Sequence, residues 1–491
     1  MPQQRQQHDI KVLSTIVNRS RSLLVLLLLI PIVAHSSYEA NWESLDSRPL
    51  PSWYDEAKFG IFIHWGVFSV PAFGSEWFWN LWNGAKDPQY IDFVKQTERP
   101  GFSYQEYASR FDAALYRPDD WANIFANSGA QYVVMTSKHH EGYCNWNSKD
   151  VPSTWNWNAM DIGPKRDILG DLAVSLKQTT SPHTNQTLKF GVYHSMLEWY
   201  NPAYVQDQRN NYTTRNFVTQ KCMPALRDLV MKYKPEIIWS DGSWDAPSDY
   251  WTSTDFLAWL STNSTVKDTV VWNDRWGNDC MCKHGSFLTC NDRYQPGKLV
   301  EKKWENALTI DKTSWGLNRN ASYTDYMTTK ELIDQLVETG AFNGNMLLNI
   351  GPGADGTIHP IFVDRLVGIG KWLLVNGNAI YNSRPWFQST NEVASNVYFT
   401  VNRERSTLYA TVLKWPDNNV LTLEHVVSTV ATEVRMLGNS NNLFSWYEAD
   451  SKFHIHVPAM TPSQIPCDHA WVFTLTKINN WSMETGKKVL S

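Results

Sequence analysis

Acidic side chains that follow apolar segments are the residues most able to do chemistry in this sequence. Asp241 lies in PEIIWSDGSWD, where an apolar run gives way abruptly to Trp, Ser, Asp and Gly. Hydrolysis of a glycoside needs one carboxylate to attack or stabilise the anomeric carbon and a second carboxyl group to protonate the departing oxygen. Asp241 is therefore a candidate nucleophile. The alternative is that it caps the helix after the strand.

Three later residues are candidates for the second carboxyl group. Asp274 stands in WNDRWG and Asp292 in TCNDRY, and because each precedes an arginine, each is also explained as an ion-pair or turn residue. Glu305 stands beside Trp304 in KKWENA, and an apolar neighbour raises the pKa of a carboxyl group as a general acid requires. Spacing alone does not select among the three.

Histidines also follow apolar segments. His64 comes after GIFI, and His139 and His140 come after YVVMTS and a lysine. Adjacent histidines on an extended segment point in different directions, so hydrogen bonding to ligand hydroxyls is more natural for them than binding one metal ion. Three histidines at equivalent strand ends favour a ligand pocket.

Tryptophan is unusually frequent, with 25 residues in the chain. Sugars present flat apolar C–H faces ringed by hydroxyls, so flat rings beside fixed hydrogen-bonding groups suit them. A single tryptophan is more often a core residue, and only clusters such as Trp77, Trp79 and Trp82 indicate a site. Trp239 and Trp244 flank Asp241, where they are expected to shield it from water.

The elements that must position these side chains alternate between strands and helices over residues 53–385, a pattern typical of βα units around a parallel sheet. Polar residues recur at the carboxyl ends of the strands, where a (β/α)₈ barrel builds its active site. A doubly wound sheet is the alternative, but no glycine-rich phosphate loop follows an early strand. Expected strands are 60–63, 131–136, 188–193, 237–239, 269–272 and 346–350, and expected helices are 119–127, 168–176, 216–232, 328–339 and 362–375.

Short alternating runs follow Trp386 and predict a carboxyl-terminal antiparallel β-sandwich over residues 386–491, after an α/β barrel domain over residues 37–385. His454 and His456 alternate onto one face of a strand, and we interpret them as structural rather than metal-binding. The runs are VYFTV, LYATVL, VLTLEHV, EVRML, FHIHV and WVFTL.

The amino end, residues 1–36, has a basic stretch, an apolar run over residues 23–34 and then small residues, which predicts a signal peptide. The run is too short for a stable membrane span, although an uncleaved anchor is the minority alternative, and no later segment has 18 consecutive apolar residues. Export agrees with glycosylation sequons at Asn185, Asn211, Asn263, Asn320 and Asn480.

Charge and cysteine content exclude further classes. A net charge of −5 and the absence of Lys/Arg runs make nucleic acid an unsuitable partner. Six cysteines are enough for a few local disulfides in an oxidising compartment, and we expect Cys280 and Cys282 to pair elsewhere, with Cys290 or Cys222. Zinc binding by Cys280, Cys282, His284 and Cys290 is disfavoured, because their spacing matches no common zinc module.

With these motifs in place, the sequence resembles the retaining α-L-fucosidases over nearly its whole mature length. The resemblance implies a barrel with a β-sandwich, a fucosylated glycan as substrate, release of α-linked L-fucose with retention, no cofactor and no metal, a secreted or lysosomal location, and a possible homo-oligomer. It rests on WYDEAKFGIFIHWG, SEWFWN, TSKHHEGY, WNAMDIGPKRDILGDL, WSDGSW, NDRWG, PGKLVEKKWE, SWGLNR and LLNIGPGADGTI.

Site residues follow from the resemblance position by position. Asp241 is similar to the family nucleophile, while Asp292 and Glu305 both fall where related enzymes have the acid/base, and the animal-like subgroup favours Asp292. The chain departs from the family at Ala307, where the signature usually has cysteine. The expected substrate contacts are His64, Glu76, Trp77, His139, His140, Tyr193, Trp239 and Arg275.

Three other functions are alternatives to this one. A non-catalytic fucose-binding barrel would lack one of the carboxyl groups, and every candidate is present. A recognition glycoprotein acting through its sandwich should expose an aromatic cluster there, whereas Trp415, Trp446 and Trp471 are scattered. A different glycosidase specificity on the same barrel is the more serious rival, because the pocket and not the fold decides the sugar.

Overall fold

The computed structural model describes residues 37–416 and 418–481. The expected signal peptide, residues 1–36, lies outside the described residues. Within the described ranges, no helix is both long enough and apolar enough to traverse a bilayer.

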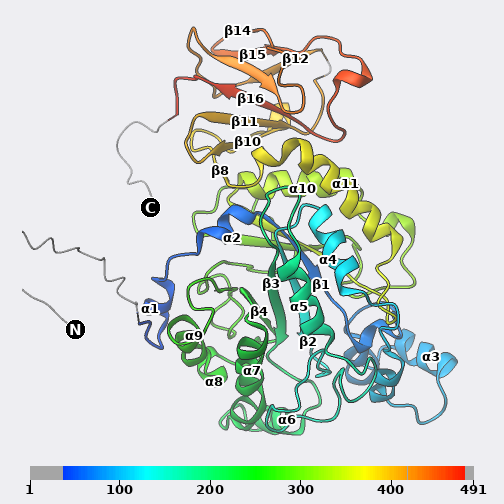
Figure 1. Ribbon diagram of the computed structural model, residues 1–491. Helices are drawn as coiled ribbons and strands as arrows, with labels where there is room; N and C mark the ends of the chain where they lie inside the picture. Colours follow the sequence, from blue (N-terminus) through cyan, green and yellow to red (C-terminus); the bar gives the residue numbers. More distant parts are fainter. Residues whose placement is uncertain (1–36, 417, 482–491) are drawn as a thin grey trace, which may run out of the picture. The chain divides into compact units, whose positions relative to one another are not determined.

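Seven parallel strands form the central sheet, in the order β5-β4-β3-β2-β1-β7-β6. In Figure 1, β1 to β4 lie within the barrel with helices around them. Every strand is buried along most or all of its length, which explains why most of these strands, though not β6, appear in the sequence as apolar runs. The strands are β1 (Phe59–Ile63), β2 (Tyr132–Lys138), β3 (Lys189–Ser195), β4 (Ile237–Asp241), β5 (Val271–Trp272), β6 (Trp304–Thr309) and β7 (Gly344–Ile350).

An extended segment, residues 286–288, bridges the two edge strands β5 and β6. The amide of Ser286 donates to the carbonyl of Trp272 (2.9 Å), and that of Leu288 donates to the carbonyl of Lys303 (2.9 Å). The amide of Glu305 then donates back to Leu288 (2.8 Å). The predicted (β/α)₈-like barrel is therefore confirmed, and this segment closes it.

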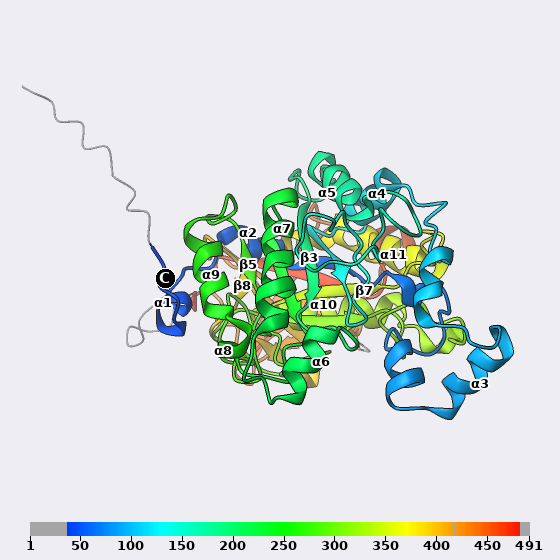
Figure 2. The same cartoon turned by 90° about the horizontal axis from the view of Figure 1, so that it is seen from below.

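Helices pack outside the sheet, and Figure 2 shows α4, α5, α7 and α10 around the strands. The helical spacing of apolar residues predicted this: Leu332, Leu336 and Val337 of α10 all join the core. Thr328 begins α10 with a capping box to Glu331. The helices are α1 (Trp42–Asp46), α2 (Ser52–Ala57), α3 (Pro88–Thr97), α4 (Pro118–Asn127), α5 (Ile168–Gln178), α6 (Pro202–Arg209), α7 (Met223–Tyr233), α8 (Ser248–Trp251), α9 (Ser253–Thr262), α10 (Thr329–Ala341) and α11 (Pro360–Asn376).

Side chains alternate between the two faces of each strand and so build two cores. On β1, Ile61 and Ile63 face the helices, while Phe62 faces the barrel interior. On β4, Ile238 faces the helices, and Trp239 points inward. The inward residues are aromatic near the carboxyl ends of these strands, and they form the floor beneath the strand-end side chains.

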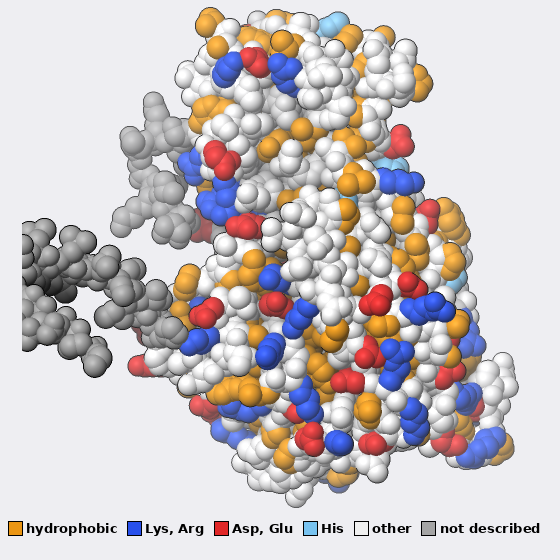
Figure 3. Space-filling view, viewed as in Figure 1, with side chains coloured by type: hydrophobic (Ala, Val, Ile, Leu, Met, Phe, Trp, Pro, Cys, Tyr) orange, Lys and Arg blue, Asp and Glu red, His pale blue; other side chains and the backbone are white. Residues whose placement is uncertain are grey.

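Two antiparallel sheets follow the barrel and share one hydrophobic core, which confirms the predicted sandwich. The short strands β8, β9 and β14 were not predicted. On the face in Figure 3, acidic and basic side chains are interspersed. The larger sheet comprises β8 (Ser383–Pro385), β9 (Asn391–Glu392), β10 (Val397–Asn402), β11 (Thr407–Val412), β13 (Glu433–Met436) and β16 (Trp471–Thr476), and the smaller comprises β12 (Val420–Leu423), β14 (Trp446–Ala449) and β15 (Lys452–His456).

Candidate active site

A small pocket opens at the carboxyl ends of the barrel strands, with a cavity volume of about 90 Å³. Pockets for drug-sized ligands occupy roughly 300–1,000 Å³, so this one suits a single small unit. The pocket brings together nearly all the site residues expected from the sequence: His64, Glu76, Trp77, His139, His140, Tyr193, Trp239, Asp241, Arg275 and Asp292.

Asp241 is the last residue of β4, and its carboxylate is held from three sides. The Tyr193 hydroxyl, on the neighbouring strand β3, donates to Oδ2 (2.8 Å). Arg275 Nη1 donates to Oδ1 (3.1 Å), and His140 Nε2 lies 3.7 Å from Oδ2. Asp241 does not cap the short helix that follows, because α8 begins only at Ser248. The carboxylate is fixed and faces the pocket.

Arg275 links Asp241 to the second carboxyl group of the pocket. Its Nη2 donates to Asp292 Oδ1 (2.7 Å) while its Nη1 contacts Asp241, so one planar guanidinium spans both carboxylates. The two neighbouring carboxylates raise the pKa of Arg275 further above its usual range despite burial. Asp292 has 46% of its side chain exposed, whereas Asp241 has 12%. One carboxylate is therefore enclosed and the other lies at the pocket mouth.

Glu305, the other acid/base candidate, lies within the barrel and does not line the pocket. Its Oε2 accepts from the hydroxyls of Tyr54 and Tyr132 (both 2.7 Å), and its Oε1 accepts from Trp239 Nε1 (2.9 Å). Burial raises the pKa of Glu305 to about 7. A raised pKa suits a general acid, but here Trp239 stands between Glu305 and the pocket as its floor.

Glu76 and the histidines form the polar wall of the pocket. His64 Nδ1 bonds Asn349 Oδ1 (2.7 Å), and Asn349 Nδ2 donates to the Trp315 carbonyl, so Nδ1 carries the proton and Nε2 is an acceptor. Burial lowers the pKa of His64 to about 3, so the ring is neutral. The Glu76 carboxylate accepts from the Trp315 amide (3.1 Å).

His139 and His140 directly follow β2, and the expectation that they point in different directions is wrong, because both rings line the pocket with their centroids 4.1 Å apart. His139 Nδ1 bonds Glu141 Oε2 (3.2 Å), and His140 Nδ1 bonds Ser195 Oγ (2.7 Å). Burial lowers the pKa of His140 well below its usual value. Each ring is oriented by a partner through Nδ1, which leaves Nε2 free for a ligand hydroxyl or, in His140, to face Asp241.

Aromatic rings complete the pocket. Trp77 and Trp244 lie nearly parallel, with centroids 5.9 Å apart, and Trp239 stacks on Tyr193. Sequence reasoning assigned no role to Phe62 or Trp315, which also line the pocket. Strand alternation could have found Phe62, because it lies two residues before His64 on the same face.

The cysteines and Ala307, which the sequence also singled out, lie outside the pocket. Cys282 pairs with Cys290, one of the two partners predicted, whereas the expected pairing of Cys280 is wrong, since Cys280 is a buried free thiol. The disulfide removes two thiolates from the zinc alternative, and the described residues contain no metal-binding cluster of three His, Cys, Asp or Glu. Ala307 packs inside the barrel rather than in the pocket.

Comparison with known proteins places this geometry in a family. The α-L-fucosidase family model matches residues 27–378, and the model of the α-L-fucosidase carboxyl-terminal domain matches residues 389–476. Human tissue α-L-fucosidase is 47% identical over 90% of this chain and 92% of the relative, and a Branchiostoma floridae α-L-fucosidase is 48% identical over 92% and 99%. The crystal structure of Thermotoga maritima α-fucosidase in complex with fucose superposes with a TM-score of 0.74 at 30% identity, covering 89% of this chain and all of that one.

A barrel with two carboxylates in a small pocket at the carboxyl ends of its strands has the arrangement of a glycoside hydrolase. The matches extend over both the barrel and the sandwich. The chain belongs to the α-L-fucosidase family.

Proposed function

We propose that this fucosidase cleaves α-L-fucosides with retention, through a covalent fucosyl-enzyme on Asp241. The observation that supports it is the Arg275 guanidinium, which contacts Asp241 (3.1 Å) and Asp292 (2.7 Å) in the same pocket. Retaining glycosidases place their two carboxyl groups about 5–5.5 Å apart, since no water has to fit between nucleophile and sugar. A single guanidinium can bridge such a pair.

Asp292 is the proposed acid/base. Its exposed position at the mouth leaves room for the departing sugar, and for the water that later enters. It protonates the glycosidic oxygen in the first step and deprotonates water in the second. Glu305 is unsuited to this role, because its carboxyl group is enclosed by Tyr54, Tyr132 and Trp239.

His64 and Glu76 supply the proposed hydrogen bonds to fucose. The neutral ring of His64 accepts a hydrogen bond from one sugar hydroxyl through Nε2, and Glu76 accepts a hydrogen bond from another. Trp77 and Trp239 offer flat faces to the apolar side of the ring. Arg275 stabilises the carboxylates and is itself held over the Trp239 ring at 4.6 Å.

The test is hydrolysis of 4-nitrophenyl α-L-fucopyranoside by the wild type and by Asp241→Gly, Asp292→Asn and Glu305→Gln. We expect Asp241→Gly to lose about 10³-fold or more in kcat and to regain activity with azide, which forms a fucosyl azide of inverted configuration. In Asp292→Asn, the pH profile of kcat/KM should lose the limb that reports the acid/base residue, whereas Glu305→Gln should keep that limb. Azide rescue of Glu305→Gln, with an unaffected Asp292→Asn, would reverse our assignment.

We further propose passage through the secretory pathway to a lysosomal or extracellular location. The Cys282–Cys290 disulfide and the tissue and plasma fucosidases among the relatives support this. A mass shift on glycosidase treatment would test the sequons, of which Asn185, Asn211, Asn263 and Asn320 are exposed and Asn480 is half-buried. Homo-oligomerisation stays a prediction, and light scattering would check it.

A further inference from the structure

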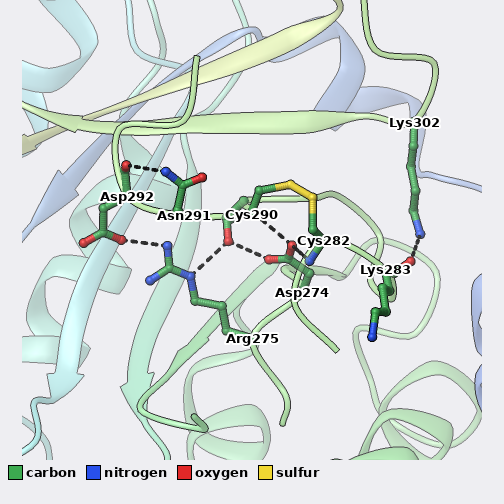
Figure 4. The surroundings of a disulfide bond; sticks show 9 residues. Asp274, Arg275, Cys282, Lys283, Cys290, Asn291, Asp292 and Lys302 are labelled. Carbon is green, nitrogen blue, oxygen red and sulfur yellow. Dashed lines mark hydrogen bonds and ion pairs between the residues drawn. A yellow bond between two sulfur atoms is a disulfide. The ribbon is translucent and has the colours of Figure 1, made fainter. Parts of the chain in front are cut away.

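The loop that carries Asp292 is anchored by a buried carboxylate outside the pocket. Asp274 is fully buried, and its Oδ2 accepts the backbone amides of Cys282 (2.8 Å) and Cys290 (3.1 Å). Its Oδ1 accepts the hydroxyl of Thr289 (2.5 Å). Three donors from one loop thus converge on one side chain, and Figure 4 shows Asp274 beside Cys282 and Cys290.

The same network reaches the catalytic pair in one further step. Arg275 Nε donates to Thr289 Oγ1 (3.0 Å), while the other two guanidinium nitrogens hold Asp241 and Asp292. A guanidinium is planar, so fixing Nε fixes the directions of both Nη donors. Thr289 is itself fully buried.

The disulfide closes this loop under backbone strain. Cys282 (φ 62°) and Cys290 (φ 55°) both adopt the left-handed conformation, and so does Arg293 (φ 53°). Residues other than glycine persist there only when the surroundings over-determine them. Here the hydrogen bonds to Asp274 and the disulfide hold the cysteines in this conformation. Asp292 lies between two of the left-handed residues, Cys290 and Arg293.

We infer that Asp274, Thr289 and the Cys282–Cys290 disulfide form a positioning unit that sets Arg275 and Asp292 for proton transfer to the leaving group. None of these groups lines the pocket, so they are positioning residues that act through Arg275 and Asp292. The inference rests on the proposed acid/base role of Asp292. Its distinctive consequence is that damage to the unit impairs acid catalysis more than nucleophilic attack.

Leaving-group dependence separates these two effects. The leaving group of a 2-chloro-4-nitrophenyl fucoside departs as a stable phenolate and needs little protonation. The galactose of a fucosyl-galactose disaccharide is a poor leaving group and needs a general acid. Thr289→Val removes the hydroxyl with little change in shape, and Thr289→Ser restores it as the matched control. Cys282→Ser with Cys290→Ser releases the disulfide but keeps Asp274 and Thr289.

We expect Thr289→Val and the double serine variant to lose about tenfold more kcat/KM on the disaccharide than on the aryl fucoside, with Thr289→Ser near wild type. Equal losses on both substrates, or none, would overturn the inference in any variant whose near-ultraviolet circular dichroism is native. Asp292→Asn serves as the reference. If Asp292→Asn is selective and Thr289→Val is not, only the positioning unit fails; if Asp292→Asn is itself unselective, the acid/base assignment fails and the inference with it.

Discussion

At the scale of single residues, the Tyr193 hydroxyl is the group whose removal isolates one contact to Asp241. Tyr193→Phe keeps the ring that stacks on Trp239 and deletes only the 2.8 Å hydrogen bond to Oδ2. Hydrogen bonds to charged groups contribute about 1.5–3 kcal/mol, so kcat/KM on an aryl fucoside should fall about 10- to 100-fold. Unchanged kinetics would mean that Arg275 and His140 fix the carboxylate without the Tyr193 hydroxyl.

Glu305 predicts a pH dependence of stability rather than of catalysis. Burial raises its pKa to about 7 in the folded state, above the 4.5 of an exposed glutamate. Between these values Glu305 is ionised in the unfolded chain but keeps its proton in the folded chain. Its contribution to the free energy of unfolding is therefore fully present below about pH 4.5 and is lost as the pH rises to 7. Glu305→Gln cannot ionise and should escape this loss.

The measurement is urea unfolding of wild type and Glu305→Gln at pH 4.5, 6 and 8. The stability of the variant relative to the wild type should increase by about 3 kcal/mol across this range. Glu301→Gln, an exposed change on the preceding loop, is the control and should follow the wild type. Parallel profiles for Glu305→Gln would show that Glu305 is ionised in the folded barrel.

Some of these residues could be predicted from the sequence, and others could not. Asp241 and the three histidines were found because each directly follows a recognisable strand. Asp292 and Glu305 were not separable, because the decisive difference is direction: Asp292 lies on a loop at the mouth, and Glu305 points into the barrel from β6. No spacing rule gives the direction of a side chain on an irregular loop.

At the scale of elements, the turn after β4 leaves no room for a side chain at Gly242. Gly242 has φ 69°, and a Cβ there would lie 2.9 Å from Ser195 Oγ, 3.0 Å from Leu197 Cγ and 3.1 Å from His140 Nδ1. Gly242→Ala should therefore destabilise the protein by about 1–3 kcal/mol and reduce activity by displacing His140. Chemical denaturation and fucoside hydrolysis check this, and Gly340→Ala, in open space on α10, is the matched control.

Elements were predictable where they are apolar and regular. Six of the seven parallel strands and five outer helices follow from periodicity. β6 was missed because Glu305, Asn306 and Thr309 make its sequence polar, although all three are buried and each makes a side-chain hydrogen bond. The closing segment was missed too, because residues 286–288 follow a cysteine-rich loop and depend on tertiary pairing with β5 and β6. Buried polar strands lack the signal that hydrophobic patterns provide.

At the scale of the whole molecule, the switch from helical spacing to short alternating runs near residue 386 predicted a barrel followed by a sandwich. The contacts between them were not predictable, because they join residues far apart in sequence. Arg403 pairs with Glu56 (3.0 Å), and Trp372 Nε1 of α11 donates to the carbonyl of Ala470 (2.9 Å). Ala470 and Val472 pack in the same core as the outer face of the barrel.

This shared core predicts that barrel and sandwich unfold together. Trp372 is 2% exposed and fills the contact, so Trp372→Ala should cost about 3–5 kcal/mol and separate one cooperative transition into two. Differential scanning calorimetry of the full chain measures this directly, with Val430→Ala, a fully exposed change in the sandwich, as the control. Two transitions already present in the wild type would mean that the Trp372 contact does not couple the units. A single lowered transition in Trp372→Ala would instead assign the coupling to Arg403 and the remaining core.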